Sequence, residues 1–205
     1  MVSSAELICT IADRLEAHHA RHIVLDPVMV ATSGAKLIDD DAITALTERL
    51  FPLAEVITPN IPETEVLLDL IAHRGASLDP AKWAEDTDRE STRIVSDTAM
   101  EDAGRTVSEH YGCAVLVKGG HGVADASDLL YADGVATWIH GVRVDNPNTH
   151  GTGCTLSSAI ASNLAKGETL PDAIRHAKDY LTGALGAQLN LGHGSGPMDH
   201  AWHWR

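Results

Sequence analysis

The clearest candidate for chemistry in this chain is the segment Asn148-Thr149-His150-Gly151-Thr152-Gly153-Cys154-Thr155. Its two glycines, two positions apart, free the backbone to present consecutive N–H groups. Apolar residues at helical spacing follow, which predicts a helix that begins in this segment: Leu156, Ala159, Ile160 and Leu164. The positive end of that helix dipole would face the glycine loop, so the segment is typical of an anion site.

Cys154 lies in the predicted first turn of this helix, where unpaired amides and the dipole favour a thiolate over a thiol. An anion site beside an ionisable group suggests phosphoryl transfer, which needs charge stabilisation and a positioned acceptor. A plainer interpretation stays open. Gly-x-Gly before a helix is also typical of a tight turn, and a cysteine in a first turn is more often a packing residue.

A second candidate is Asp26-Pro27-Val28-Met29, which follows an apolar run. A carboxylate at the end of a strand can hold Mg²⁺, directly or through water. It can equally bond the amides of its own turn. Asn60-Ile61-Pro62-Glu63 also has two interpretations, because Asn followed three residues later by Glu resembles a capping box. The same residues would place Glu63 beside a ligand crevice, and both roles are compatible.

The third candidate is Lys118-Gly119-Gly120-His121, after another apolar run. Lys118 would be a point charge for phosphate, and Gly119 and Gly120 would let the backbone approach a ligand closely. The pattern is not a Walker A loop, because Gly-x-x-x-x-Gly-Lys-Ser/Thr is absent. A simple turn at the end of a strand is the alternative.

Strands and helices that alternate along the chain must position these residues. Strands are predicted at 21–25, 54–58, 113–117, 128–132 and 135–140, the last two around an Asp133-Gly134 turn. Helices are predicted from a Ser3-x-x-Glu6 capping box, from Asp39 or Asp40, from Ile61, from the glycine loop and from near Pro171. This order predicts an α/β layered fold with a largely parallel sheet. Ligands bind beyond the carboxyl ends of such strands, where all the candidate residues fall.

Composition limits the classes of partner. The 205 residues carry a formal net charge of −14, which disfavours nucleic acid and anionic membranes as partners. Three cysteines without metal-ligand spacing indicate free thiols in a reducing, cytoplasmic location. The length suits a single domain, 1–205, and the polar, weakly periodic residues 73–97 are expected to form a mobile surface excursion.

Together these segments resemble the ribokinase-like superfamily, and within it the hydroxymethylpyrimidine/phosphomethylpyrimidine kinases of thiamine biosynthesis. The resemblance rests on residues 24–34, 57–63, 115–121, 148–155 and 192–197. It implies a three-layer αβα sandwich, ATP with Mg²⁺, and phosphorylation of the hydroxymethyl group and then of the monophosphate. It leaves a homodimer open. Cys154 in place of the superfamily's usual Asp is also compatible with a pyridoxal kinase.

The resemblance also implies roles for single residues. Cys154 would deprotonate or orient the acceptor hydroxyl, and Gly151, Thr152 and Gly153 would form the anion hole. Lys118, Gly119, Gly120 and Asn60 would contact ATP, Asp26 and Glu63 would organise Mg²⁺, and Met1 and Val28 would contact the substrate. The family's N-terminal strand and Gly-rich segment have no counterpart here, so an N-terminally truncated kinase is expected. An inactive module that only binds nucleotide is the further alternative.

Overall fold

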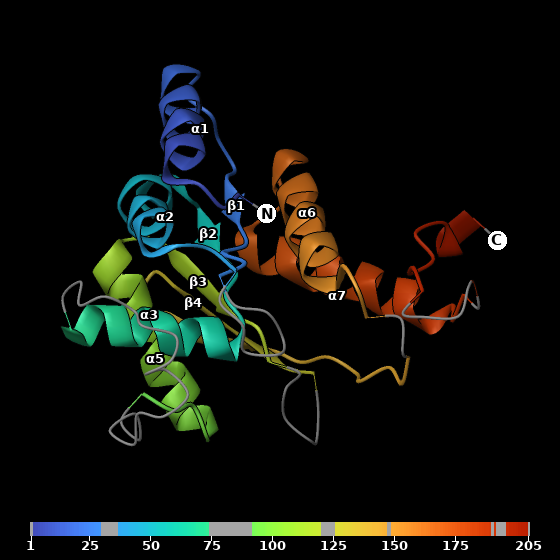
Figure 1. The fold of residues 1–205 in the computed structure, drawn as a ribbon. Coiled ribbons are helices and arrows are strands. Elements are labelled where there is room, and N and C mark those ends of the chain that lie inside the picture. The colour runs from blue at the N-terminus through green and yellow to red at the C-terminus, as the bar shows by residue number, and fades with distance from the viewer. Residues whose placement is uncertain are drawn as a thin grey trace. The chain divides into compact units, whose positions relative to one another are not determined.

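The computed structural model describes residues 2–29, 37–73, 92–119, 126–146, 149–189, 191 and 196–204. The chain forms two compact units. The first unit consists of residues 1–119 and 129–138, and the second unit consists of residues 120–128 and 139–205. Figure 1 labels the elements of both units.

The sheet has five strands whose spatial order follows the order of the chain. β1 (Val24–Leu25), β2 (Val56–Ile57) and β3 (Ala114–Val117) are parallel. β4 (Asp128–Ala132) runs antiparallel to β3 and is followed by β5 (Val135–Ile139). The buried runs of β-branched and leucine residues favour strands covered on both faces. The largely parallel α/β architecture expected from the sequence is confirmed.

A two-residue turn joins the last two strands. Asp133 and Gly134 have φ angles of +51° and +77°, the left-handed conformation at both central positions that a type I′ turn requires. The predicted hairpin is therefore present. Strands β1, β2 and β3 are shorter than the predicted ranges, because residues such as Ile23 and Thr58 make single hydrogen bonds beside the ladder rather than extending it.

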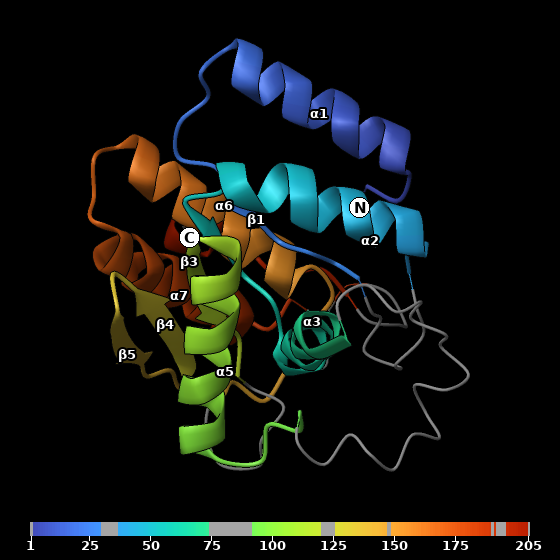
Figure 2. The same cartoon turned by 90° about the vertical axis from the view of Figure 1, so that its left-hand side faces the viewer.

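Four α-helices belong to the first unit: α1 (Ala5–Ala17), α2 (Asp40–Ala45), α3 (Ile61–His73) and α5 (Asp97–Tyr111). Figure 2 shows α1 running beside α2, which continues through a π-helical turn (Leu46–Leu50) and a 3-10 turn (Phe51–Leu53). α5 packs against both α3 and β3.

Two helix boundaries correct the sequence analysis. The cap of α1 is Ser4 and not Ser3, because Ser4 has an extended backbone and its hydroxyl accepts the N–H of Leu7 at 3.3 Å. α5 was not predicted at all, although its signals are present. Ser96 caps its start, its buried residues recur at helical spacing (Met100, Ala103, Gly104, Val107), and Gly112 ends it at a φ of +71°.

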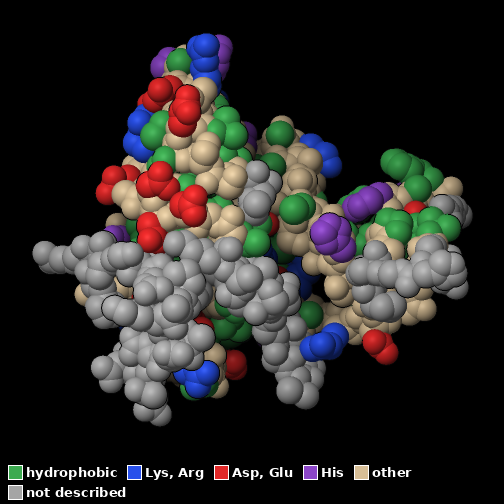
Figure 3. Space-filling model, in the orientation of Figure 1, with side chains coloured by type: hydrophobic (Ala, Val, Ile, Leu, Met, Phe, Trp, Pro, Cys, Tyr) green, Lys and Arg blue, Asp and Glu red, His purple; other side chains and the backbone are tan. Residues whose placement is uncertain are grey.

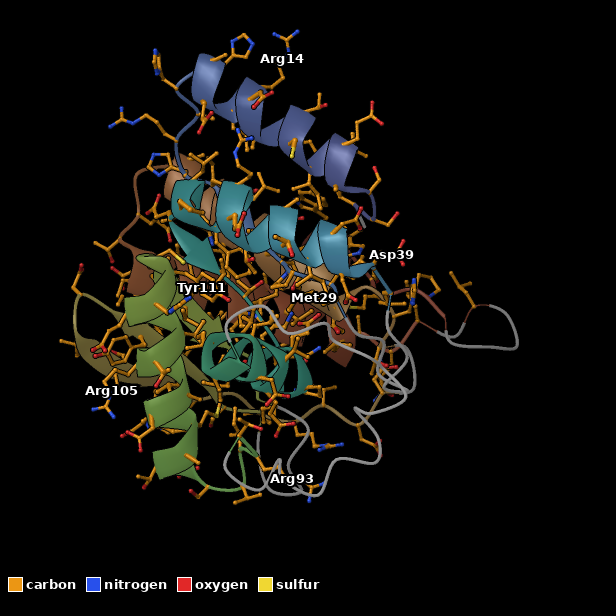
Figure 4. The ribbon with its side chains drawn as sticks, turned by 60° about the vertical axis from the view of Figure 1, so that its left-hand side comes forward. Arg14, Met29, Asp39, Arg93, Arg105 and Tyr111 are labelled. Carbon is orange, nitrogen blue, oxygen red and sulfur yellow. The ribbon has the colours of Figure 1, made fainter. Side chains whose placement is uncertain are left out.

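The core of the first unit contains fully buried side chains from every one of its helices except α2, and from the sheet. Phe51 is central, and its ring meets that of Tyr111 edge-on with the centroids 4.9 Å apart. Burial raises the pKa of Tyr111 to about 12. Figure 4 labels Tyr111 on α5 and Met29, which is fully buried.

The second unit contains α6 (Thr152–Ala165) and α7 (Leu170–Gly186), which pack against each other. A 3-10 turn (Trp202–Trp204) follows near the C-terminus. Lys178 of α7 forms a buried ion pair with Asp128, with Nζ and Oδ2 2.5 Å apart, and also donates to the carbonyl of Ala126. This pair fastens the middle of α7 to residues 126–128.

The acidic balance of the chain is visible on the surface. Figure 3 shows carboxylates gathered over α1 and α2, where exposed acidic residues include Glu6, Asp13, Glu16, Asp41 and Glu48. Within the part of the chain that the structure describes, no helix combines the length and apolar character needed to cross a membrane.

Candidate active site

An ion pair between Asp26 and Lys118 lies at the carboxyl ends of β1 and β3. Lys118 Nζ is 2.6 Å from Asp26 Oδ1, and the two side chains are only 15% and 13% exposed. The hydroxyl of Thr58, which follows β2, donates to the same oxygen at 3.2 Å. Three strands thus each deliver one polar group to the same place. Removing either charge would leave the other buried and unpaired, which typically costs about 3–5 kcal/mol.

Backbone hydrogen bonds continue past the strands and fix this arrangement. The N–H of Thr58 donates to the carbonyl of Leu25 at 2.9 Å, and the N–H of Lys118 donates to that of Pro59 at 2.8 Å. Asn60 and Lys118 form a further parallel bridge. The positions of these residues are therefore set by the register of the parallel strands. The convergence at the strand ends that the sequence predicts is present for Asp26, Asn60, Glu63 and Lys118.

Glu63 is 2% exposed and both its carboxylate oxygens accept backbone amides. Oε2 accepts the N–H of Asn60 at 2.9 Å, while Asn60 Oδ1 accepts the N–H of Glu63 at 2.8 Å. Oε1 accepts the N–H of Met29 at 3.0 Å. Glu63 thus completes a capping box at the start of α3 and also holds the turn that follows β1. Burial raises the pKa of Glu63 above its ordinary value, and the positive charge of Lys118 opposes that rise.

Val28 occupies a strained place in the same turn. Its φ angle is +46°, in the left-handed region that β-branched residues rarely adopt. The residue is half-buried between Asp26 and Met29. Strain of this kind costs about 1–3 kcal/mol and persists where the surroundings enforce it, often at a ligand site.

The acidic residues offer an incomplete set of metal ligands. The hydrogen bonds to Asp26 from described residues all go to Oδ1, which leaves Oδ2 available. Glu63 already accepts an amide on each oxygen. No group of three or more histidine, cysteine or acidic side chains in the described ranges could hold a metal ion. Mg²⁺ keeps several waters and is commonly bound by one or two carboxylates plus phosphate oxygens, so this residue set fits it.

The glycine loop of the second unit begins α6 as the sequence predicts. Gly151 is the N-cap at a φ of +83°, and no side chain caps the helix. The N–H of Thr155 returns to the carbonyl of Gly151 at 2.9 Å. The amides of the first turn, at Thr152, Gly153 and Cys154, are therefore left without a side-chain cap at the positive end of the helix, which suits a phosphate.

Cys154 is exposed in this first turn. It lines an open groove of about 610 Å³ together with residues of α6, α7 and the C-terminal segment, among them Thr155, Ser158, Tyr180 and His200. The hydroxyl of Tyr180 lies 3.2 Å from Nδ1 of His200. A volume of this size is in the range of small-molecule sites.

Some predicted residues lie outside the described part of the chain: Met1, Gly120, His121, Asn148 and residues 30–34 and 192–195. Gly119 is described and is half-buried directly after Lys118. The sequence analysis missed two contributors. Thr58 could have been found as the polar residue before Pro59 at a strand end, whereas the role of Met29 is played by its backbone N–H and has no signal in the side chain.

Strand-end Asp, Asn-x-x-Glu and Lys residues, together with a glycine-led helix, define an α/β protein with phosphate- and metal-binding features. The chain belongs to the phosphomethylpyrimidine kinase family, whose profile matches residues 1–199. This is a family of phosphotransferases, so ATP is implied as the phosphate donor.

Curated relatives carry matching names. The hydroxymethylpyrimidine/phosphomethylpyrimidine kinase of Haemophilus influenzae is 38% identical over 98% of this chain and 68% of its own length. That of Rhizobium meliloti is 42% identical over 100% of this chain and 70% of its own. The thiamine biosynthesis bifunctional protein ThiED of Geobacter sulfurreducens is 43% identical, and the match spans 36% of that protein. The chain thus spans about two thirds of the single kinases that it matches.

Solved structures agree on the fold. Phosphomethylpyrimidine kinase from Clostridium difficile aligns with a TM-score of 0.66 and 32% identity, over 89% of this chain and 65% of that one. Pyridoxal kinase from Bacillus subtilis, in an ADP complex, aligns with a TM-score of 0.78 and 28% identity, over 100% of this chain and 69% of that one. The ribokinase-like architecture is therefore established, and the pyrimidine kinases are the more similar group by sequence.

Proposed function

We propose that this chain catalyses ATP-dependent phosphorylation of 4-amino-5-hydroxymethyl-2-methylpyrimidine and then of its monophosphate, as a step of thiamine biosynthesis. The observation that carries the proposal is the meeting of Asp26, Asn60, Glu63 and Lys118 at the strand ends in a chain whose relatives are named for this activity. The uncapped start of α6 supplies a second phosphate-binding feature.

Each group has a task in this proposal. Lys118 and the amides of Thr152 and Gly153 stabilise phosphate charge. Cys154 orients the acceptor hydroxyl or accepts its proton. Asp26 and Glu63 would hold Mg²⁺, which neutralises charge on the phosphates when it is bound. Positioning and electrostatics of this kind account for most of the catalysis of phosphoryl transfer.

The test is a kinase assay with ATP and Mg²⁺ in which hydroxymethylpyrimidine, its monophosphate and pyridoxal are compared as acceptors. The proposal predicts a higher kcat/KM for the two pyrimidines than for pyridoxal. A preference for pyridoxal would assign the chain to the alternative activity. ADP binding by calorimetry without turnover of any acceptor would support a nucleotide-binding module instead.

The location and assembly proposed from the sequence are a cytoplasmic protein, open to homodimer formation. Three free cysteines, Cys9, Cys113 and Cys154, are consistent with a reducing compartment. Sedimentation analysis would determine the assembly.

A further inference from the structure

The Asp26–Lys118 pair joins the residue expected to hold the metal to the residue expected to hold phosphate. Lys118 Nζ contacts only one carboxylate oxygen, Oδ1, and both side chains are largely buried. In the ligand-free chain each of these residues is therefore the counter-ion of the other. Neither charge is free for a ligand while the pair persists.

The two cations that Asp26 could accept exclude each other electrostatically. An ammonium in contact with Oδ1 and a divalent ion at the same carboxylate would lie within a few ångströms, where like charges repel strongly in a poorly solvated site. Lys118 also acts electrostatically on Glu63, the second acidic group here. Movement of Lys118 away from Asp26 would leave two acidic side chains without a cation, and this favours a metal ion.

The surroundings allow the lysine side chain to move while its backbone stays in place. The N–H of Lys118 is held by the carbonyl of Pro59, and Lys118 is bridged to Asn60. Its ammonium is a point charge on a flexible four-carbon stem that can change partners. Asp26 remains oriented without it, because the hydroxyl of Thr58 donates to Oδ1.

We propose that Lys118 exchanges partners during binding: it neutralises Asp26 in the free chain, moves to the nucleotide phosphates, and thereby frees Asp26 for Mg²⁺. This inference rests on the proposed function and adds a coupling between its two ligands. Nucleotide and metal then bind cooperatively beyond their own chelation, and by linkage each raises the affinity of the chain for the other by the same factor.

The test measures binding rather than activity. Calorimetry gives the Kd of ADP in EDTA, and electron paramagnetic resonance gives the Kd of Mn²⁺ for the chain without nucleotide. Wild type is compared with Asp26→Asn, Lys118→Met and the double variant. Asp13→Asn serves as the matched control, because Asp13 forms an exposed ion pair with Arg49 in the same unit, at 2.7 Å. Circular dichroism verifies that each variant is folded.

The partner exchange predicts that Asp26→Asn tightens metal-free ADP binding by about tenfold, within the usual range of coupling between sites. Lys118→Met should tighten Mn²⁺ binding similarly, and Asp13→Asn should change neither. The gain from Asp26→Asn must disappear in the Lys118→Met background, because the freed lysine causes it.

An equal gain in both backgrounds would mean that Asp26 simply repels the nucleotide, and this would overturn the exchange. No gain in either single variant would overturn it as well. If a substitution unfolds the chain, Thr58→Val gives the second measurement. It leaves both charges in place, so it should keep the ADP–Mn²⁺ coupling, and loss of that coupling would contradict the exchange. Failure of wild type to bind ADP even with Mg²⁺ would instead refute the proposed function.

Discussion

Asn60 and Glu63 each bind the other's backbone N–H, at 2.8 and 2.9 Å, while the remaining oxygen of Glu63 reaches the N–H of Met29. One carboxylate therefore fastens the start of α3 to the turn after β1. The capping role and the ligand-site role, which the sequence alone leaves side by side, meet in the same buried group. The capping half is observed, and the metal half is the part that experiments must decide.

Glu63→Gln is expected to lower both stability and metal affinity. An amide has one acceptor oxygen, so one of the N–H groups of Asn60 and Met29 would lose its partner, at a cost of about 1–3 kcal/mol in the free energy of unfolding. Denaturant titration measures this cost, with the exposed Glu48→Gln as a control that should change little. The Mg²⁺ concentration for half-maximal turnover should also rise. Loss of stability with an unchanged Mg²⁺ requirement would indicate capping alone.

The same residue predicts a pH dependence. Burial raises the pKa of Glu63 in the folded chain above its ordinary value of 4.5. As the pH rises above 4.5, the unfolded chain releases this proton while the folded chain retains it. The contribution of Glu63 to stability is therefore greatest below that pH and falls as the pH rises through the raised pKa.

Denaturation at several pH values checks this sign. The stability of wild type relative to Glu63→Gln should decrease as the pH rises through the window above 4.5. Glu48→Gln should follow the wild-type profile. A wild-type advantage that grew with pH over this range would contradict a raised pKa.

Cys154→Ala is expected to reduce turnover by roughly 10²-fold or more, the usual scale for a lost general base. The affinity for ADP with Mg²⁺ should change little, because the amides at the start of α6 remain. Cys9→Ala, a half-buried cysteine of α1, is the matched control for removal of a thiol. Turnover near that of wild type would remove Cys154 from the chemistry.

The cysteines should differ in their reaction with iodoacetamide. Cys154 is exposed, whereas Cys113 is buried and burial raises the pKa of its thiol to about 11. Thiolates are the reactive form, so at pH 8 the folded chain should be labelled at Cys154 well before Cys113. Peptide mass spectrometry over time follows both sites. Equal rates in the folded chain would mean that Cys113 is more accessible than described.

Val28→Gly should relieve backbone strain. Glycine adopts a φ of +46° freely, so the variant should gain part of the roughly 1–3 kcal/mol that such strain costs, less about 0.5–1 kcal/mol of added chain entropy on unfolding. Val142→Gly is the control. Val142 is exposed and is not among the residues with positive φ, so its variant should only lose stability. Equal losses in the two variants, measured by thermal unfolding, would argue against strain at Val28.

Local patterns in the sequence carried much of this structure. The Asn60–Glu63 box lies within one turn of helix, and Asp133-Gly134 specifies its own turn, so both can be predicted from neighbouring residues. Gly151 likewise marks the start of α6. α5 shows the opposite error, because a polar and partly exposed helix gave a weaker pattern than the buried strands, despite its serine cap.

The pairing of Lys118 with Asp26 could not be predicted in the same way. The two residues are 92 positions apart, and only the register of three parallel strands brings them into contact. Their types suggested one task each, phosphate and metal. That each also serves as the counter-ion of the other depends on burial and distance, which a sequence does not contain.

The strand order has a consequence for synthesis on the ribosome. Each strand neighbours the one made just before it, so the sheet can grow at one edge as the chain emerges and needs no later strand to insert between earlier ones. Asp26 is synthesised long before Lys118, and its buried carboxylate has no cation until β3 has joined β2. Completion of the third strand is therefore the moment at which the emerging chain becomes electrostatically balanced at this site.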